Sequence, residues 1–497
     1  MRGRRCLGQE RGEPRLAHTI GAILARASNA VHAEPEASGA RGTHFLLRGR
    51  PAFAILGWNR TTRGPQAEAP RNRRRGGSLM LKHMPKPFQS GKHAARALVS
   101  GLLLATILVL LAPSSSYLAI EQPHVGFGAF LAERSDAYLV DNMEFDWVVW
   151  QLQWSLAEPY EWDYRWQGLD ELLDYAHDLG LKVVLRVDSA PSWARRGPEG
   201  APPGNMEDFG DFMSALASRA AGKVSGYVIW NEPNLPINWG GSPSAAKYVE
   251  MLQAVYPRIK AADPDAAVIT AGMATTGGPG GSECGLASGL GSGPLTAYTQ
   301  ELYASGVVND LDFICRIYLR GGKPYFDVLG SHPYGFAYEP QRDPGSVSGL
   351  AFRRVEQQRA LMEIRNDGEK QIWAIEFGWI LDPGSTCRQW GDWPTRTWQI
   401  VSEQQQADYL RDAYLYAMSR YPWMGVMSFF NMDFATVYWY DECEPARWYS
   451  VAYRQNHLDP FHSPIVYREG YYALQGMANA LAGGPKAFVP LGMRNQG

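Results

Sequence analysis

The chain has 497 residues, of which 45% are hydrophobic and 20% charged, close to the average of globular proteins and unlike disordered or fibrous chains. The formal charge of −2 is unevenly distributed. Residues 1–80 carry 15 Arg and 5 Glu with no Lys or Asp, a net of +10, which leaves −12 for the remainder. An acidic body argues against a nucleic-acid partner, because phosphate binding requires clustered Lys and Arg.

The first 79 residues show no helical or strand periodicity and are rich in Arg, Gly, Ala and Pro. The absence of Lys beside so many Arg residues is typical of a coding bias rather than of a functional basic tail. We therefore interpret residues 1–79 as a disordered extension or as translated upstream sequence. Met80 and Met84 are then the candidate start positions.

A short apolar run follows this extension. Basic residues precede an uncharged apolar stretch at 97–112, which Pro113 interrupts. This pattern predicts a signal peptide within residues 80–119. Alternatively, segment 97–120 stays uncleaved as a membrane anchor, because ~20 apolar residues span a bilayer. Both alternatives predict an extracytoplasmic protein, either secreted or attached to the membrane through this segment alone.

Residues 120–490 alternate strand-like apolar runs with helical patterns. Strands are expected at 124–128, 145–154, 182–188, 226–234, 266–274, 326–335, 371–379 and 424–432. Helices are expected at 169–180, 206–222, 245–264, 295–306, 352–368, 402–420 and 470–483. Nearly continuous apolar strands are buried on both faces, and no glycine-rich phosphate loop is present. This alternation predicts an α/β fold: a (β/α)8 TIM barrel forming a single catalytic domain, with long loops at its C-terminal face.

Polar residues stand where three of the expected strands end. Asn231 and Glu232 close the fourth strand, His332 and Tyr334 the sixth, and Glu376 the seventh. The active site of a (β/α)8 barrel lies at this end of the strands. A lone Glu after a strand is usually a cap or part of an ion pair, but two facing carboxylates are what glycoside hydrolysis needs. We expect the two carboxyl groups about 5–5.5 Å apart, the spacing of retaining enzymes.

The motifs VIWNEPN, SHPYG and WAIEFGW resemble clan A of the glycoside hydrolases, which are retaining (β/α)8 enzymes. The resemblance covers about residues 124–483 and is nearest to family 39, with family 5-like relatives. It implies that Glu232 is the acid/base and Glu376 the nucleophile. It also implies that Asn231 holds the sugar 2-hydroxyl and that Tyr334, with His332 beside it, hydrogen-bonds the nucleophile.

Two positions depart from the clan's pattern. Clan members commonly carry an Arg near the end of the second strand, where this sequence has none. Arg186 on the third strand is a candidate substitute, although it could equally pair with Asp188. The clan's Trp at the end of the eighth strand is also missing, which leaves Phe429, Phe430 or Trp439 to form the floor of the sugar site.

Further candidate substrate-binding residues are Trp193, Trp239 and Trp379, as platforms for sugar rings. Each of these three indoles is also a natural packing residue. Asp433, after the eighth strand, either contacts sugar hydroxyls or caps a loop.

The body contains four cysteines, an even number that permits two disulfides in an exported protein. Cys387 and Cys443 lie in loops after the seventh and eighth strands, which are neighbours at the mouth of a barrel. Cys284 and Cys315 both lie between the fifth and sixth strands. We therefore favour the pairs Cys387–Cys443 and Cys284–Cys315. No Cys or His spacing indicates a metal site.

The sequence thus predicts a retaining glycosidase that acts on a poly- or oligosaccharide with two Glu residues and needs no cofactor. Two alternatives stay open. A barrel whose nucleophile lacks its Arg support would bind glycans without cleaving them, and a transglycosylase would pass the sugar to another carbohydrate.

Overall fold

The computed structural model describes residues 125–287, 295–437, 441–456 and 463–482, which all belong to one compact unit of residues 53–497. The predicted extension and the apolar segment 97–120 lie outside the described residues, as does Trp439. No helix within the described ranges is long and apolar enough to cross a membrane.

A curled parallel sheet of nine strands forms the centre of this unit, in the order β5-β4-β3-β2-β1-β9-β8-β7-β6. The first strand pairs with both the second and the last, so the two ends of the domain's sequence meet in the sheet. The strands are β1 (Gly126–Leu131), β2 (Trp147–Gln153), β3 (Lys182–Asp188), β4 (Val224–Ile229), β5 (Ala267–Thr270), β6 (Met273–Ala274), β7 (Leu329–His332), β8 (Ile372–Phe377) and β9 (Met424–Phe429). An antiparallel hairpin of β10 (Ala452–Arg454) and β11 (Ile465–Tyr467) lies apart from this sheet.

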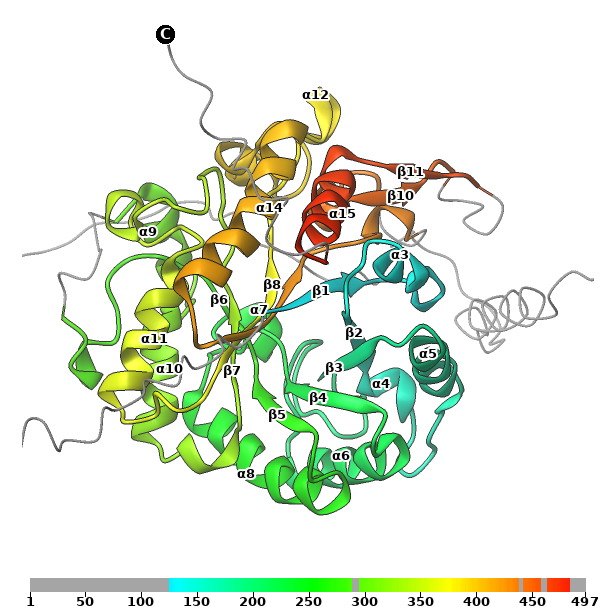
Figure 1. The fold of residues 1–497 in the computed structure, drawn as a ribbon. Coiled ribbons are helices and arrows are strands. Elements are labelled where there is room, and N and C mark those ends of the chain that lie inside the picture. Colours follow the sequence, from blue (N-terminus) through cyan, green and yellow to red (C-terminus); the bar gives the residue numbers. More distant parts are fainter. Residues whose placement is uncertain (1–124, 288–294, 438–440, 457–462, 483–497) are drawn as a thin grey trace, which may run out of the picture. The chain divides into compact units, whose positions relative to one another are not determined.

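Helices surround the strands (Figure 1). They are α3 (Tyr138–Asp141), α4 (Trp154–Ala157), α5 (Gln167–Asp178), α6 (Met206–Ala220), α7 (Pro236–Trp239), α8 (Ala245–Ala262), α9 (Ala297–Ala304), α10 (Asp310–Leu319), α11 (Arg354–Ile364), α12 (Gly384–Cys387), α13 (Trp393–Arg396), α14 (Glu403–Arg420) and α15 (Glu469–Ala482). Local capping fixes their starts: the side chain of Asn205 caps α6, and Ser402 forms a capping box with Gln405 at α14. Helix α10 is absent from the predicted elements, although Asn309 caps its first turn.

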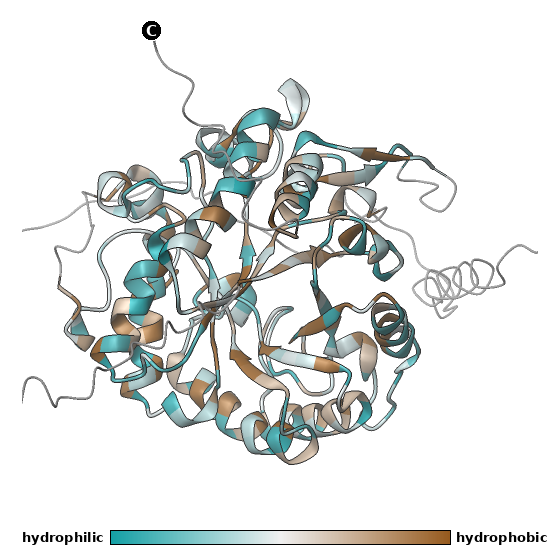
Figure 2. Ribbon diagram, in the orientation of Figure 1, coloured by the Kyte–Doolittle hydropathy of each residue, from teal (hydrophilic) through white to brown (hydrophobic). Residues whose placement is uncertain are grey.

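Both faces of the strands are buried, which explains their continuous apolar character. In β3, Val184 belongs to an inner cluster, whereas Val183 and Leu185 pack in the larger core. The inner cluster draws on nearly every strand: Phe130, Val149, Val184, Val228, Ile269, Val328, Ile375 and Val426. Figure 2 shows the apolar character of the strands and the mixed character of the helices around them.

The expected fifth strand is divided in two, because the backbone passes close to the side chain of His332 at Gly272. A Cβ atom on Gly272 would lie 2.0 Å from Cδ2 of His332, so only glycine lets that imidazole ring reach its position. The strand therefore splits into β5 and β6 around this residue, and β6 pairs with β7. Ile269 of β5 also bridges Val328, just before β7.

Most expected strands are longer than the observed ones at their carboxyl ends. Strand β4 ends at Ile229, before Asn231 and Glu232, and β7 ends at His332, before Tyr334. These residues therefore leave the sheet and are free to turn toward the space above it.

Candidate active site

Glu376 lies near the end of β8 with 4% of its surface exposed. Its Oε1 forms an ion pair with the guanidinium of Arg186, and its Oε2 accepts a hydrogen bond of 2.8 Å from the hydroxyl of Tyr334. Burial, followed by the charge of Glu376, raises the pKa of Tyr334 well above its usual value. The phenol therefore remains a neutral donor, and Glu376 is held by two donors in one orientation.

Glu232 lies just beyond β4 and is also buried. Its Oε1 lies 3.0 Å from Nδ1 of His332, and its Oε2 accepts a hydrogen bond of 3.2 Å from Asn238. The backbone here has positive φ at two non-glycine residues, 73° at Trp230 and 39° at Glu232. Such conformations are costly and concentrate at functional sites, because the surrounding structure must hold them in place.

His332 joins the two carboxylates. Its Nδ1 lies 3.0 Å from Glu232 and 3.7 Å from Oε2 of Glu376, and the ring is fully buried. One ligating atom from each of these three residues lies within 4.8 Å of the others. This short separation resembles the ~5–5.5 Å of retaining glycosidases rather than the ~6.5–9.5 Å of inverting ones. The same atoms are close enough to ligate a cation, but the guanidinium of Arg186 already neutralises Glu376.

Arg186 makes both of the contacts that the sequence left open. Besides Glu376, its Nε donates to Oδ2 of Asp188 at 3.0 Å, and both side chains are buried. Gln151, on the strand that lacks the clan's Arg, donates to Oδ1 of Asp188 at 2.7 Å. Burial lowers the pKa of Arg186, but the charges of Asp188, Glu376 and Glu232 outweigh it and raise that pKa. A relay from Gln151 through Asp188 and Arg186 thus supports the carboxylate of Glu376.

Asn231 is 8% exposed, and its Oδ1 is buried without a hydrogen-bond partner. Buried polar atoms are normally paired, so this oxygen calls for a donor from outside the protein.

The structure contradicts the predicted sugar-platform role of two of the three Trp residues. Trp379 is 1% exposed, packs on Phe352 and Phe377, and donates its N–H to the carbonyl of Tyr338. Trp239 is 5% exposed and packs against Trp230. Both are core residues: the segment after β7 covers Trp379, and Trp239 packs within the segment after β4.

Trp193 remains partly exposed, and its N–H donates to the carbonyl of Glu158. Phe429 is a core residue, whereas the ring of Phe430 lies beside those of Tyr334 and Tyr449. Of the two Phe candidates for the floor, Phe430 is thus the one that lies beside the tyrosine bonded to Glu376.

Asp433 takes the loop-capping role. Its carboxylate accepts the backbone N–H groups of Ala132 and Glu133 at 2.8 and 3.0 Å. Burial raises the pKa of Asp433 well above its usual value, as does the charge of Asp136.

Sequence reasoning missed Asn238 and Tyr449. Asn238 reaches Glu232 from the short helix α7, and Tyr449 packs its ring 5.4 Å from that of Tyr334. No motif marks either residue, because Asn238 lies on a four-residue helix and Tyr449 on a short 3-10 turn, and neither directly follows a strand.

The cysteines form the two favoured pairs, Cys284–Cys315 and Cys387–Cys443. The second bond joins the loop after β8 to the loop after β9. Both loops leave the sheet at the end where Glu232 and Glu376 lie.

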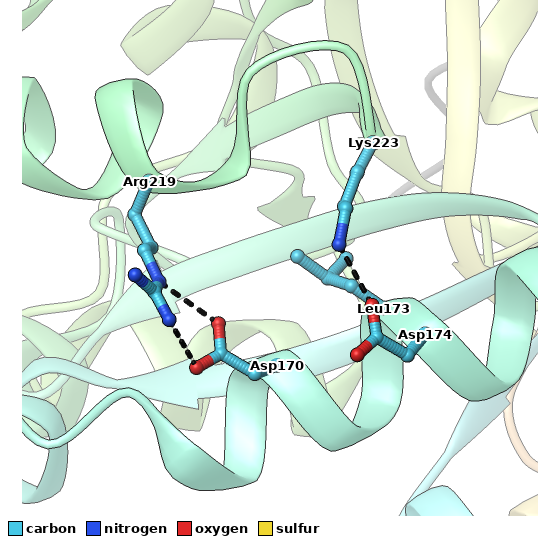
Figure 3. A pocket seen from close by; sticks show the side chains of 5 residues that line it. All are labelled: Asp170, Leu173, Asp174, Arg219 and Lys223. Carbon is cyan, nitrogen blue, oxygen red and sulfur yellow. Dashed lines mark hydrogen bonds and ion pairs between the residues drawn. The ribbon is translucent and has the colours of Figure 1, made fainter.

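A hollow of about 430 Å³ lies elsewhere on the surface, on helices α5 and α6 (Figure 3). Its charges neutralise one another, because Arg219 pairs with Asp170 and Lys223 with Asp174, both at 2.7 Å. It offers a ligand no unpaired charge, and it lies on the helical exterior rather than at the strand ends.

Residues 124–304 match the sequence model of Cellulase, glycosyl hydrolase family 5. A search of curated proteins found no match. Among solved structures, the chain is similar to a family 39 glycoside hydrolase from the gut symbiont Bacteroides cellulosilyticus WH2, with 19% identity, a TM-score of 0.47, and coverage of 72% of this chain and 64% of that one. The chain thus spans less than two thirds of that protein.

Two further structures are similar. One is a monomeric beta-xylosidase from Caulobacter crescentus CB15, with 14% identity, a TM-score of 0.43, and coverage of 71% of this chain and 67% of that one. The other is a family 5 protein from Streptomyces cattleya in complex with Manβ1-4GlcNAc, with 13% identity, a TM-score of 0.49, and coverage of 74% and 83%. Residues 124–304 thus resemble family 5 of the glycosyl hydrolases, and this range contains β1 to β6 with Glu232 but not Glu376.

Proposed function

We propose that this chain hydrolyses O-glycosidic bonds of an oligo- or polysaccharide by double displacement, with Glu376 as nucleophile and Glu232 as acid/base. The observation that carries the proposal is the different bonding of the two carboxylates. Glu376 is paired with the fixed cation of Arg186 and accepts a hydrogen bond from Tyr334, and the two contacts hold the attacking carboxylate in one orientation. Glu232 has no cation of Lys or Arg within ion-pair distance among the described residues, which suits a group that must give and take a proton.

The reaction then follows from this arrangement. Glu376 attacks the anomeric carbon while Glu232 protonates the leaving oxygen, and a glycosyl–enzyme ester forms. Glu232, now ionised, takes a proton from water, which attacks the same carbon and releases the sugar. The unpaired oxygen of Asn231 accepts a hydrogen bond from the sugar hydroxyl beside that carbon. The alternative of a purely glycan-binding barrel was based on a nucleophile without a supporting Arg. Arg186 pairs with Glu376, so that argument for the alternative no longer applies.

The scaffold of this site is, in our proposal, a closed (β/α)8 barrel. Strands β5 and β6 are two parts of one strand, divided at Gly272, and count together as the fifth of eight. The bridge between Ile269 and Val328 and the pairing of β6 with β7 support closure between the fifth and sixth strands.

We also propose that the protein acts outside the cytoplasm, exported through segment 97–120. The two disulfides support this location, because such bonds persist in oxidising compartments. Deletion of residues 97–120 from the full chain should retain the protein in the cytoplasm, as fractionation of the producing cells would show. Export of the deleted chain at the normal level would contradict this.

A panel of 4-nitrophenyl glycosides, followed by oligosaccharides of the preferred sugar, tests the proposed activity. We expect release of nitrophenol and a first-formed sugar of the substrate's own anomeric configuration, measured by proton NMR. An inverted first product would contradict the mechanism. No turnover on any glycoside, with binding of oligosaccharides retained, would favour the binding protein, and transfer to added acceptor sugars in preference to water would favour the transglycosylase.

A further inference from the structure

Tyr449 lies at the active site but takes no part in the two steps of the proposed reaction. It ends the 3-10 helix Pro445–Tyr449 in the segment after β9, and it is partly exposed. Its ring lies 5.4 Å from the ring of Tyr334 and 5.7 Å from that of Phe430. The rings of Tyr334 and Phe430 are themselves 6.3 Å apart, so the three rings form a closed triangle. Tyr334 is the residue whose hydroxyl donates to Glu376.

All three ring contacts of this triangle are edge-to-face. The interplanar angles are 67° between Tyr449 and Tyr334, 71° between Tyr449 and Phe430, and 72° between Tyr334 and Phe430. Aromatic rings prefer such contacts to a face-to-face sandwich, because the positive edge of one ring meets the negative face of the other. A swing of Tyr334 away from Glu376 would break two of the three contacts. The triangle therefore limits the motion of the phenol that holds the nucleophile.

The backbone makes room for this packing at Gly378, which directly follows the strand of the nucleophile. A Cβ atom on Gly378 would lie 2.6 Å from the carbonyl oxygen of Phe430 and 3.2 Å from Cδ1 of Tyr449. The first distance is shorter than real Cβ contacts, so any larger residue would displace the segment after β9 from the end of β8. Glycine at this position thus lets the ring of Tyr449 approach the site.

The turn that carries Tyr449 is anchored on both sides. The hydroxyl of Ser450, the next residue, donates to Oδ1 of Asn431 at 2.6 Å, and both of these side chains are fully buried. The disulfide Cys387–Cys443 joins the same segment to the loop after β8. The ring of Tyr449 is therefore presented by an anchored turn rather than by a loose loop.

The phenol of Tyr449 stays neutral beside the two carboxylates. Burial raises its pKa, the charge of Arg396 opposes the rise, and the charges of Glu376 and Glu232 add to it. A neutral ring brings no charge that would compete with Tyr334 for the carboxylate of Glu376. The contact that Tyr449 makes toward the nucleophile is therefore the packing of its ring on Tyr334.

We infer that Tyr449 is a positioning residue of the nucleophile, whose ring holds the phenol of Tyr334 against Glu376. The inference rests on the proposed function and deepens it, because it extends the support of the nucleophile to a turn that no strand motif marks. Glu376 is then oriented from two sides: Arg186 contacts Oε1 from β3, and Tyr334, with Tyr449 behind it, contacts Oε2. Small displacements of a reacting group slow a reaction strongly, so loss of the ring should lower kcat rather than substrate affinity.

The test measures kcat and KM of Tyr449 variants on the best 4-nitrophenyl glycoside of the panel. Tyr449→Leu removes the ring and should lower kcat about tenfold, with KM within about twofold. Tyr449→Met also removes the ring and takes the place of Tyr449→Leu if that variant does not fold. Tyr449→Phe keeps the ring and should keep kcat within about twofold. In a Tyr334→Phe background, which lacks the hydroxyl bonded to Glu376, Tyr449→Leu should cause no further loss, because the contact that it supports is already absent.

Trp448→Leu is the matched control, because Trp448 precedes Tyr449 on the same turn but, within the described ranges, packs no ring on Tyr334. It should leave kcat within about twofold. The inference is overturned by an unchanged kcat in Tyr449→Leu, by an equal loss in Tyr449→Phe or Trp448→Leu, or by a full further loss in the Tyr334→Phe background. Each of these results leaves the proposed function standing. An unaltered protein that hydrolyses no glycoside would overturn both.

Discussion

Arg186 on β3 and Glu376 on β8 form a buried ion pair across 190 positions of the sequence. Each side chain is 5% exposed, so water screens the pair little. Arg186 also holds Asp188, which makes it the single cation between two buried acids. Its replacement therefore affects both the fold and the chemistry.

Arg186→Met should lower the free energy of unfolding by about 3–5 kcal/mol, because it leaves Glu376 and Asp188 buried without a counter-charge. Activity should fall as well, since Glu376 loses one of the two groups that orient its carboxylate. Urea unfolding followed by circular dichroism measures the first effect. Arg219→Met is the control, because the Arg219–Asp170 pair lies on the surface and its loss should cost much less (Figure 3). Equal costs in the two variants would contradict the prediction.

Glu376→Gln should abolish turnover on every glycoside by several orders of magnitude, because the amide cannot form the glycosyl–enzyme ester. Its melting temperature should stay close to that of the unaltered protein or above it, which separates lost chemistry from lost folding. Substantial activity on a glycoside with a good leaving group would exclude Glu376 as nucleophile.

Glu232→Ala should behave differently on activated substrates. An aryl glycoside with a good leaving group needs no proton, so the ester still forms, but its hydrolysis is slow without a base. Added azide should restore turnover and give a glycosyl azide of retained configuration, detectable by NMR. Rescue of the Glu376 variant by azide with inverted product, and none of Glu232→Ala, would reverse the two assignments.

The two disulfides should contribute similarly to stability. Replacing Cys387 and Cys443 by Ser opens a loop of 56 residues, and replacing Cys284 and Cys315 opens one of 31. Each loss should cost about 4 kcal/mol in the chain-entropy account. Urea unfolding of the two double variants, followed by circular dichroism, measures both losses. An unchanged free energy of unfolding in either double variant would contradict the prediction.

Glu444 should make stability depend on pH. Burial raises its pKa to about 7 from 4.5, although Arg396 opposes the shift. The folded protein therefore binds this proton more tightly than the unfolded chain, and stability falls as pH rises from 4.5 to 7. Glu444→Gln removes this dependence, so its melting temperature relative to the unaltered protein should increase across that interval. A constant difference between the two proteins from pH 4.5 to 7 would contradict the raised pKa.

The sequence by itself determined the alternation of strands and helices and the residues that end the strands. Period and apolar content are local properties, so the runs around Val184 and Ile375 predicted strands buried on both faces. Parallel strands place their carboxyl ends together. The sequence alone therefore predicted that Glu232, His332 and Glu376 lie close to one another.

Only the tertiary structure decided which side chains support that site. Arg186, Asp188 and Gln151 form their relay because β2, β3 and β8 bring them into one interior, and no local pattern encodes that choice. The sequence predicted that the indole of Trp379 is a platform for a sugar ring, but the loop after β7 buries it. Burial and pairing depend on residues far away in the chain, whereas periodicity depends on neighbours, and that difference separates what could be predicted from what had to be observed.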